Sequence, residues 1–356
     1  MVKARQVADK PKVRSPKKQI SKVNKVGSKT TKAKQLSSKS EFSIAKKDLV
    51  TLPAIDMNDP EDKIVPAIMK MLTEVGFLHL RNVSGFSEER LLADVKEFHR
   101  LPDKVKLAGQ PKHINKKNEN VYRGWFPFFD NDVSHKEFFD MGCPLKEMSE
   151  EQKQYPLVEE TPFPKEAKYK SIVKKYRDWW KFQHSVCMKL LEYIAIGLGK
   201  DRSYFKPWFE KDSIATFRSI HYLPRAQTGV KSDKLDQTGL KLTTPEHADS
   251  GFITLLSTFS FPGLQVQMPD GKYRSVRPEK DNLVVNIGAY FSKITNYKLK
   301  ATMHRVLDIG RERYSSPFFL DPRFDAKIPE NLMTADGKEK EGSVEYGVQM
   351  VIRMRN

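Results

Sequence analysis

The segment TPEHADSGFITLL, residues 244–256, places a histidine and an aspartate two positions apart in a run typical of a β-strand. Because successive side chains of a strand alternate between its two faces, we expect His247 and Asp249 to project from one face. An imidazole and a carboxylate suit Fe(II), and a second histidine would complete a facial triad that leaves three coordination positions open. His-x-Asp alone arises by chance, so the prediction depends on the rest of the chain.

His304 is the best candidate for the third ligand among the eight histidines of the chain. It lies in a later strand candidate, ATMHRVLDI, which follows the apolar run LVVNIG. His221 is the alternative, but it stands beside Tyr222 in a segment that we expect to contact an organic ligand. The remaining histidines fall in the N-terminal half and are less suited: His79, His99, His113, His135 and His184.

A second pair of polar residues follows His304 by nine positions, in ERYSSPFF. Arg313 and Ser315 are again two apart in an expected strand, so they share a face. A guanidinium with a hydroxyl forms a suitable fork for a carboxylate in a partly buried cavity. The order His-x-Asp, His, Arg-x-Ser is much more specific than any of its members.

Charge is unevenly distributed along the 356 residues, which carry a net charge of +18. Residues 1–40 hold thirteen Lys or Arg and one acid, so this segment contributes +12. It has no aromatic residue and no sustained apolar periodicity, and we predict that residues 1–48 form a disordered basic tail. A nuclear address, a nucleic-acid arm, an organelle peptide and a solvated tail without a specific partner remain open.

Apolar periodicity predicts helices in the first half and short strands in the second. We expect helices over 60–74, 87–101 and 165–198, the last being the longest. In this half we expect strands over 50–57, 76–83 and 135–142. From residue 213 the short strands, separated by Gly, Pro, Asp and Lys, predict an antiparallel sandwich or barrel; they are IATFRSIHYL, TPEHADSGFITLL, GLQVQM, YRSVRP, NLVVNIG, ATMHRVLDI and RYSSPFFL.

Over about residues 50–325 the chain resembles the 2-oxoglutarate-dependent non-haem iron oxygenases, in the branch shaped like isopenicillin N synthase and the plant flavonoid and gibberellin oxygenases. The segments that carry the resemblance are LPAID, EVGFLHL, FHRLPDKVK, VYRGWFP, KEFFDMG, HADSGFITLL, GLQV, LVVNIGAYFSKITN and HRVLDIGRERYSSPFF. The resemblance implies an α+β chain built on a double-stranded β-helix, a jelly-roll or cupin-like barrel with an N-terminal helical region. We expect a basic tail (1–48), an N-terminal α/β region (49–165), a backing helix (166–200), the catalytic core (201–325) and a C-terminal extension (326–356).

By matched position, the resemblance implies roles for individual residues. His247, Asp249 and His304 would ligate iron and be catalytic. Arg313, Ser315 and Tyr222 would bind 2-oxoglutarate, with Asn286 a polar position beside them. Tyr122, Arg123 and Trp125 would contact substrate. Ile220 departs from the family, which has a polar Asn before the His-Tyr pair.

The implied activity is that of an Fe(II)- and 2-oxoglutarate-dependent dioxygenase that uses O2 and, as an optional reductant, ascorbate. Its substrate would be a small organic molecule of specialised metabolism, and a carboxylated one if Arg218 and Arg305, two further cations near the expected site, face the cavity. The outcome would be hydroxylation, desaturation or ring closure. Alternatives are a macromolecule-modifying oxygenase docked through the tail and an iron oxidase that uses no 2-oxoglutarate. The intact five-residue constellation argues against a non-catalytic binding module.

Partners and location follow from composition. No apolar run approaches the roughly 20 residues of a membrane helix, so we expect no membrane partner. Two cysteines, Cys143 and Cys187, favour a reducing compartment. We therefore expect an intracellular protein, in the cytoplasm, or in the nucleus or an organelle if the tail acts as an address. Residues 1–40 could make non-specific polyanion contacts, and the oligomeric state is left open.

Overall fold

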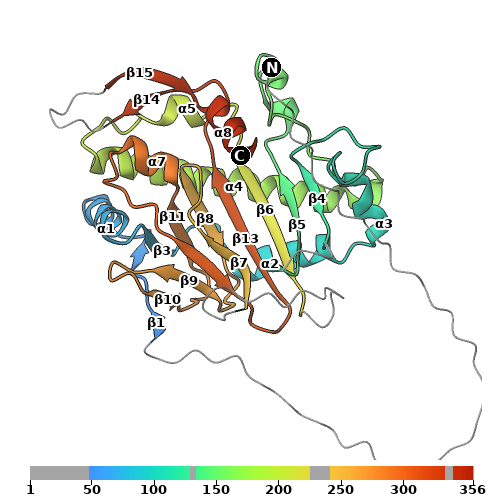
Figure 1. Cartoon of the computed structure of the whole chain (residues 1–356), viewed down its shortest axis with the longest axis horizontal. Coiled ribbons are helices and arrows are strands. Elements are labelled where there is room, and N and C mark those ends of the chain that lie inside the picture. Colours follow the sequence, from blue (N-terminus) through green and yellow to red (C-terminus); the bar gives the residue numbers. More distant parts are fainter. Residues whose placement is uncertain (1–47, 129–133, 225–240, 333–339, 356) are drawn as a thin grey trace, which may run out of the picture.

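The computed structural model describes residues 48–128, 134–224, 241–332 and 340–355. The predicted tail, except for its last residue, lies outside the described residues. Figure 1 shows a sheet of long strands in front of the longest helix, α4 (Lys170–Gly197). No helix in the described part of the chain is long and apolar enough to cross a membrane.

The larger sheet has eight strands, and strands from the N-terminal region flank those of the catalytic core. Neighbouring strands are antiparallel, except for the first pair, which is parallel. The segments 49–165 and 201–325 are therefore hydrogen-bonded into one structure. In spatial order the strands are β2 (Ala54–Asp56), β3 (Phe77–Arg81), β11 (Leu283–Ile287), β8 (Ile253–Ser257), β13 (Arg313–Leu320), β6 (Thr216–Tyr222), β5 (Lys136–Met141) and β4 (Gly124–Phe126).

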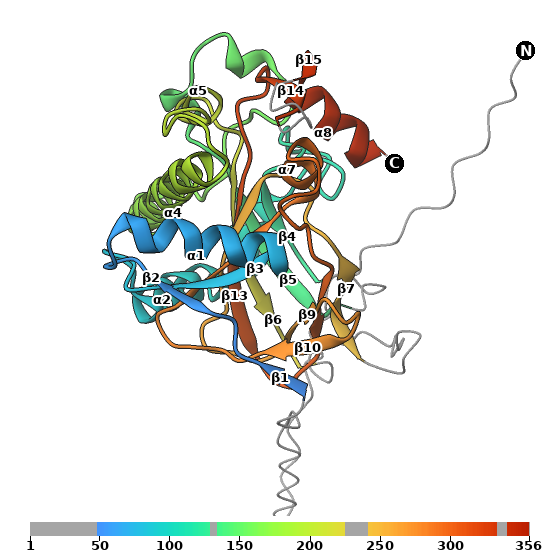
Figure 2. The same cartoon turned by 90° about the vertical axis from the view of Figure 1, so that its left-hand side faces the viewer.

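The smaller sheet has five strands and lies on the side of the larger sheet away from α4 (Figure 2). The two sheets together form the double-stranded β-helix that the resemblance implies, with helices covering the outer face of the larger sheet. In spatial order the strands of the smaller sheet are β1 (Leu49–Val50), β10 (Tyr273–Val276), β9 (Leu264–Gln267), β12 (His304–Leu307) and β7 (Leu242–His247).

Helix α4 is the main backing element. The residues at helical spacing that predicted it are buried, except for the half-buried Phe182; the buried ones are Ile172, Tyr176, Trp179, Val186, Leu190 and Ile194. The helix packs against α1 (Glu61–Glu74), α2 (Glu88–His99) and the strands β6, β8 and β13. It begins at Lys170, later than predicted, because residues 167–169 form a 3-10 turn. The other elements are α3 (Asp103–Lys106), η2 (Leu107–Gly109), η3 (Leu145–Glu147), η4 (Gln152–Gln154), η5 (Ala167–Tyr169), α5 (Lys206–Phe209), α7 (Ala289–Ile294), β14 (Lys327–Asn331), β15 (Lys340–Glu345) and α8 (Tyr346–Arg355).

Two predicted strands are each divided in the structure. The segment 50–57 forms β1 and β2, which lie at the edges of different sheets. They are separated around Pro53, whose ring cannot donate to a ladder but whose carbonyl accepts a hydrogen bond from His79. The other strands predicted from residue 213 onward begin and end within three residues of their predicted bounds.

The prediction of one strand over 244–256 was wrong, and the difference concerns the site. Strand β7 ends at His247 in the smaller sheet, and β8 begins at Ile253 in the larger one. Between them the carbonyl of Asp249 accepts a hydrogen bond from Ala289 N (2.7 Å), and the carbonyl of Phe252 accepts one from Gly288 N (2.8 Å). Because the start of α7 satisfies these carbonyls, the chain turns there instead of continuing a ladder.

Candidate active site

Three side chains converge where the chain crosses between the two sheets. His304, the first residue of β12, pairs directly with His247, the last residue of β7. Asp249 Oδ1, from the turn after β7, lies 3.6 Å from His247 Nε2 and 3.8 Å from His304 Nε2. The expected convergence is therefore present, although Asp249 reaches it from a turn and not from the face of a strand.

Both imidazoles are oriented by backbone carbonyls. His247 Nδ1 lies 2.8 Å from the carbonyl of Pro245, and His304 Nδ1 lies 3.1 Å from that of Thr302. Because a carbonyl can only accept, each Nδ1 carries the proton and each Nε2 presents a lone pair. Burial also lowers the pKa of His304, which favours the neutral ring that a metal requires.

The carboxylate of Asp249 is held by two donors on its other oxygen. Thr254 Oγ1 donates to Asp249 Oδ2 at 2.5 Å, and Asn286 Nδ2 donates to it at 2.8 Å. Oδ1 is thereby directed toward the two imidazoles. The donor set of two Nε2 atoms and one carboxylate oxygen fits Fe(II), with outer partners already in place. Asn286 thus contacts a candidate metal ligand, whereas the sequence placed it among co-substrate contacts.

Arg313 and Ser315 share the inner face of β13, as predicted. The Arg313 side chain is 5% exposed, its Nε has no hydrogen-bond partner, and it makes no ion pair with any described residue. Its Nη2 donates to Thr243 Oγ1 at 3.1 Å. Burial lowers the pKa of this guanidinium, since no carboxylate of the described residues contacts it to compensate its desolvation. A buried guanidinium in this state fits an anionic ligand.

Tyr222 lies opposite Arg313 on β6 and completes this group. The Arg313 guanidinium lies 3.5 Å from the centre of the Tyr222 ring, and Ser315 Oγ lies 3.5 Å from its hydroxyl. Burial opposes ionisation of the phenol, but the charges of Arg313 and Lys136 outweigh it and lower the pKa of Tyr222. Two hydroxyls and one guanidinium thus surround a single space, suitable for one carboxylate.

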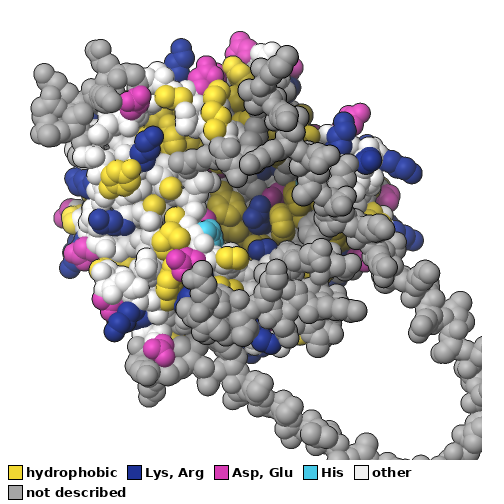
Figure 3. All heavy atoms as spheres, viewed as in Figure 1, with side chains coloured by type: hydrophobic (Ala, Val, Ile, Leu, Met, Phe, Trp, Pro, Cys, Tyr) yellow, Lys and Arg dark blue, Asp and Glu magenta, His cyan; other side chains and the backbone are white. Residues whose placement is uncertain are grey.

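Two adjoining cavities meet at Asp249. The smaller, about 120 Å³, lies between the sheets and is lined by all three together with Arg313, Ser315 and Tyr222. The larger, about 560 Å³, shares Asp249, Arg218 and Thr254 with it and extends toward β4 and α8. Figure 3 shows a hollow in this face with histidine, basic and apolar side chains inside it.

Two of the three predicted substrate contacts line the larger cavity. These are Tyr122 and Arg123, and Phe126 of β4 lines it as well. Trp125 does not line it, and its predicted substrate contact is not supported. Because neighbours in β4 face opposite sides, Trp125 points outward and its Nε1 donates to Glu137 at 2.7 Å.

Two features of the cavities were not predicted as site residues. Arg218 forms a two-point ion pair with Asp140, at 2.6 and 2.8 Å, where the cavities join. Thr254 orients Asp249. From the sequence Arg218 is only a further cation near the site, but alternation in β6 puts it four residues before Tyr222 and on the same face. Thr254 carried no local signal, because it reaches Asp249 only after the chain turns.

The comparisons with known proteins agree with this geometry. A model described as the 2OG-Fe(II) oxygenase superfamily matches residues 216–322, and one described as the N-terminal part of non-haem dioxygenases in morphine synthesis matches residues 52–166. The chain is 28% identical over 319 residues to isopenicillin N synthase of Amycolatopsis lactamdurans, covering 83% of this chain and 93% of that one. It is 34% identical over 168 residues to gibberellin 20 oxidase 3 of Arabidopsis thaliana, covering 46% and 41%.

Solved structures share the fold. A full-length Neurospora crassa protein in complex with alpha-KG and thymine superposes with a TM-score of 0.69 at 22% identity, covering 88% of this chain and 98% of that one. The dioxygenase for auxin oxidation in rice superposes with a TM-score of 0.62 at 19% identity, covering 85% and 95%. At these identities the likeness establishes the architecture alone.

Proposed function

Since this chain belongs to the 2OG-Fe(II) oxygenase superfamily, we propose that His247, Asp249 and His304 hold its iron and that Arg313 anchors its co-substrate. The protein is an Fe(II)- and 2-oxoglutarate-dependent dioxygenase that acts with O2 on a small organic molecule. The observation that carries the residue assignment is the convergence of two Nε2 atoms and Asp249 Oδ1 beside a buried guanidinium that pairs with no described carboxylate.

The protein's own residues would orient and protect the reacting groups. The carbonyls of Pro245 and Thr302 keep the two Nε2 atoms directed at the metal, and Asn286 fixes the oxygen that Asp249 offers. Arg313, with Ser315 and Tyr222, would take the distal carboxylate of 2-oxoglutarate. When bound, the iron centre supplies the oxidant that removes a substrate hydrogen, with succinate and carbon dioxide as co-products.

The larger cavity supports a carboxylated substrate. Arg123 lines it, is 5% exposed and makes no ion pair with a described residue. Its guanidinium donates to Thr216 Oγ1 and to the carbonyl of Ile214, both neutral. Burial lowers the pKa of Arg123. The carboxylates of Asp140, Glu159 and Asp321 act on the Arg123 guanidinium without contacting it, so a substrate carboxylate would form the direct ion pair that no described residue makes.

Anaerobic titration of the Fe(II)-loaded protein with 2-oxoglutarate tests the co-substrate site. We expect the weak visible charge-transfer band of the chelate to appear in the wild type and to be absent in His304→Ala. A folded, iron-loaded wild type without the band would favour the alternative, an iron oxidase that uses no 2-oxoglutarate. Undiminished activity in His304→Ala would remove this histidine from the ligand set. Ascorbate is tested in the same enzyme by its effect on the number of turnovers.

Matched pairs of small acids and their primary amides test the substrate class, with succinate release as the readout. We expect the acids to stimulate succinate release more strongly in the wild type, and this preference to disappear in Arg123→Gln. Arg177→Gln, at a half-buried position of α4 paired with Glu160 and outside both cavities, is the matched control. An amide that outcompetes its acid in the wild type would contradict a carboxylated substrate.

The basic tail remains a separate proposal, that residues 1–40 make polyanion contacts. Removal of these residues should leave turnover of a small substrate unchanged. A macromolecule-modifying enzyme would instead lose turnover at physiological salt.

The two thiols, Cys143 and Cys187, are free in the structure and support an intracellular location. Imaging of the tagged full chain, with and without the tail, would test this location.

A further inference from the structure

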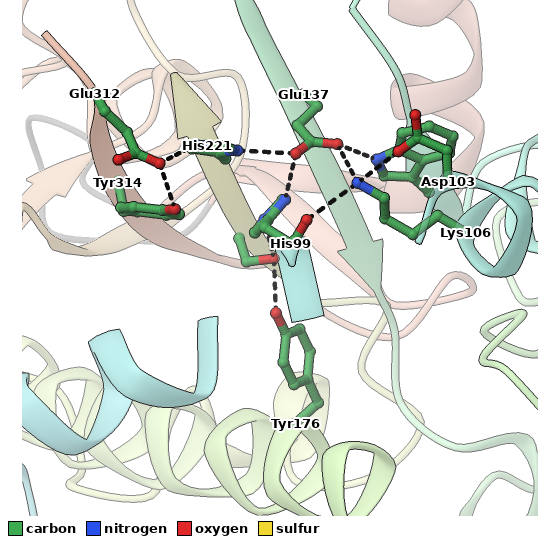
Figure 4. Close-up of polar contacts among 10 residues, drawn as sticks. His99, Asp103, Lys106, Glu137, Tyr176, His221, Glu312 and Tyr314 are labelled. Atoms are coloured by element: carbon green, nitrogen blue, oxygen red, sulfur yellow. Dashed lines mark hydrogen bonds and ion pairs between the residues drawn. The ribbon is translucent and has the colours of Figure 1, made fainter. Parts of the chain in front are cut away.

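A second cluster of titratable side chains lies on the outer face of β5, β6 and β13, behind the candidate co-substrate site (Figure 4). Glu137 is at its centre. Its Oε1 lies 2.9 Å from His221 Nδ1 and 3.3 Å from His99 Nδ1. Its Oε2 accepts from Lys106 Nζ at 2.9 Å and from Trp125 Nε1 at 2.7 Å. None of these groups takes part in the proposed reaction.

The cluster has the residue types of a metal site, but its contacts fit a proton better. His99, Glu137 and His221 could together offer three ligand atoms. The ammonium of Lys106 already lies on the same carboxylate, is buried, and would repel a cation bound there. Glu137 thus already has a buried cation and an indole N–H as partners, so we assign no metal to it.

His221 lies between two carboxylates, and this position determines its charge. Its Nδ1 is 2.9 Å from Glu137 Oε1, and its Nε2 is 2.8 Å from Glu312 Oε1. A neutral imidazole can donate from only one nitrogen, so its other nitrogen would face a carboxylate lone pair. Glu137 also accepts from the Lys106 ammonium and the Trp125 indole, and Glu312 also accepts from the Tyr314 hydroxyl, and these donors favour the ionised form of both acids. Two ionised acceptors require N–H on both sides of the ring.

Among the described residues, no cation other than His221 bridges Glu137 and Glu312. His99 is fully buried, and burial lowers its pKa, which favours its neutral form. Lys106 forms an ion pair with Glu137 alone of these two acids, and the Tyr314 hydroxyl donates a hydrogen bond to Glu312 at 2.9 Å. Several described elements place titratable or charged groups around the His221 ring. Strand β5 gives Glu137, and the start of β13 gives Glu312 and Tyr314. The helical side gives Lys96 and His99 of α2, Arg100 after the end of α2, and Asp103 and Lys106 of α3.

The cluster is joined to the co-substrate site through two adjacent strands. His221 precedes Tyr222 on β6, and Tyr314 follows Arg313 on β13. In the ladder Tyr314 faces His221, and Arg313 faces Tyr222. The rings of His221 and Tyr314 stack, with their centres 4.5 Å apart and their planes within 5°. Outer-face contacts therefore alternate with the inner-face residues that would hold 2-oxoglutarate.

We propose that His221 is a positioning residue, held as an imidazolium between Glu137 and Glu312, which fixes Tyr222 and Arg313 for the distal carboxylate of 2-oxoglutarate. Glu312 directly precedes Arg313, so its bond to His221 restrains the start of β13. Loss of one His221 proton leaves one ring nitrogen as an acceptor that faces a carboxylate, and this loosens the restraint. The affinity for 2-oxoglutarate then falls as the pH rises. The inference rests on the proposed co-substrate site.

The experiment measures the dissociation constant of 2-oxoglutarate by anaerobic calorimetry on the Fe(II)-loaded full chain, at about pH 6 and about pH 9. We expect wild-type binding to weaken roughly five- to twentyfold at the higher pH. His221→Gln should bind weakly at both. Glu312→Gln should bind well at both, because its amide can donate to a neutral His221. The control is His184→Gln, at a half-buried histidine of α4 bonded to the Phe209 carbonyl.

Nitrogen-15 NMR of the histidine rings supplies a readout that needs no co-substrate. Two N–H signals assigned to His221 in the wild type at neutral pH, and one in Glu312→Gln, are expected. A single ring N–H in the wild type, a pH-independent affinity, or a second metal ion per chain would overturn the inference alone. If the wild type binds no 2-oxoglutarate at either pH, the co-substrate site fails and the positioning role fails with it. A His221→Gln chain that does not fold leaves Glu312→Gln and the wild-type NMR to decide.

Discussion

Replacement of Arg313 by methionine should separate the stability of the protein from its affinity for 2-oxoglutarate. In the structure the guanidinium is buried, stacks on Tyr222 at 3.5 Å and donates to the neutral hydroxyl of Thr243. Its Nε has no partner, and it makes no ion pair with a described residue. The folded protein therefore bears the desolvation of a cation that a bound carboxylate would compensate.

The two effects have opposite signs. Truncation of one partner of a buried, hydrogen-bonded charge pair costs about 2–5 kcal/mol of binding, or roughly 30- to 5000-fold in Kd. Methionine has a similar length and no charge, so the free energy of unfolding without ligand should stay unchanged or increase by up to about 2 kcal/mol. Arg313→Lys keeps the charge but loses the fork, and it should lie between wild type and Arg313→Met in affinity.

Calorimetric titration with 2-oxoglutarate and urea unfolding of the ligand-free protein measure these quantities. Arg323→Met removes a guanidinium that forks onto Asp325 at 2.6 and 2.9 Å, away from both cavities. It should leave the affinity unchanged. An Arg313→Met chain that unfolds at clearly lower urea than the wild type, with an unaltered Kd for 2-oxoglutarate, would refute the anchoring role, since Arg313 would then be a structural residue.

Three further predictions concern other parts of the structure. Asn286→Ala removes a donor to Asp249 and should weaken Fe(II) binding about 10- to 100-fold in chelator competition; unchanged affinity would contradict the orienting role. Burial raises the pKa of Asp321 from 3.8 to about 6. The folded protein therefore binds this proton more tightly than the unfolded chain, which adds about 3 kcal/mol to the free energy of unfolding below pH 3.8. This contribution is lost as the pH rises through about 6. Asp321→Asn should flatten the urea stability profile over that window, and a parallel profile would argue against the shift. Gly76→Ala should lower Tm markedly, because φ is +75° and a Cβ would lie 2.2 Å from the Lys300 carbonyl; an unchanged Tm would show that the backbone can move there.

Local patterns account for the parts of the site that lie within single strands. Arg313 and Ser315 share a face because β13 has a period of two, and that period is written in neighbouring residues. The long helix was likewise predicted from its periodic apolar residues. The resemblance did not reveal which face of β4 Trp125 occupies. Side chains of β4 alternate between its two faces, and the indole of Trp125 lies on the face away from the cavity, where it donates to Glu137.

Contacts between distant segments could not be predicted in this way. Asp249 reaches the histidines through a turn held by backbone groups at the start of α7. Asp249, Ser250 and Gly251 are turn-forming residue types, but the groups that hold the turn lie far along the chain. The outer cluster joins His99, Glu137 and His221, which come from three separate elements and form no motif. Each of these arrangements depends on hydrogen bonds between residues far apart in the sequence.

The sequence by itself determined which residue types are available to the site, their order, and the helical or strand period of each element, because these properties depend on near neighbours. Only the tertiary structure decided that His247 and His304 face each other across a ladder, that Arg313 is buried without a described carboxylate beside it, and that a histidine between two carboxylates lies behind it. Charge compensation and burial are set by the packing of distant strands and helices, and packing is a property of the folded chain.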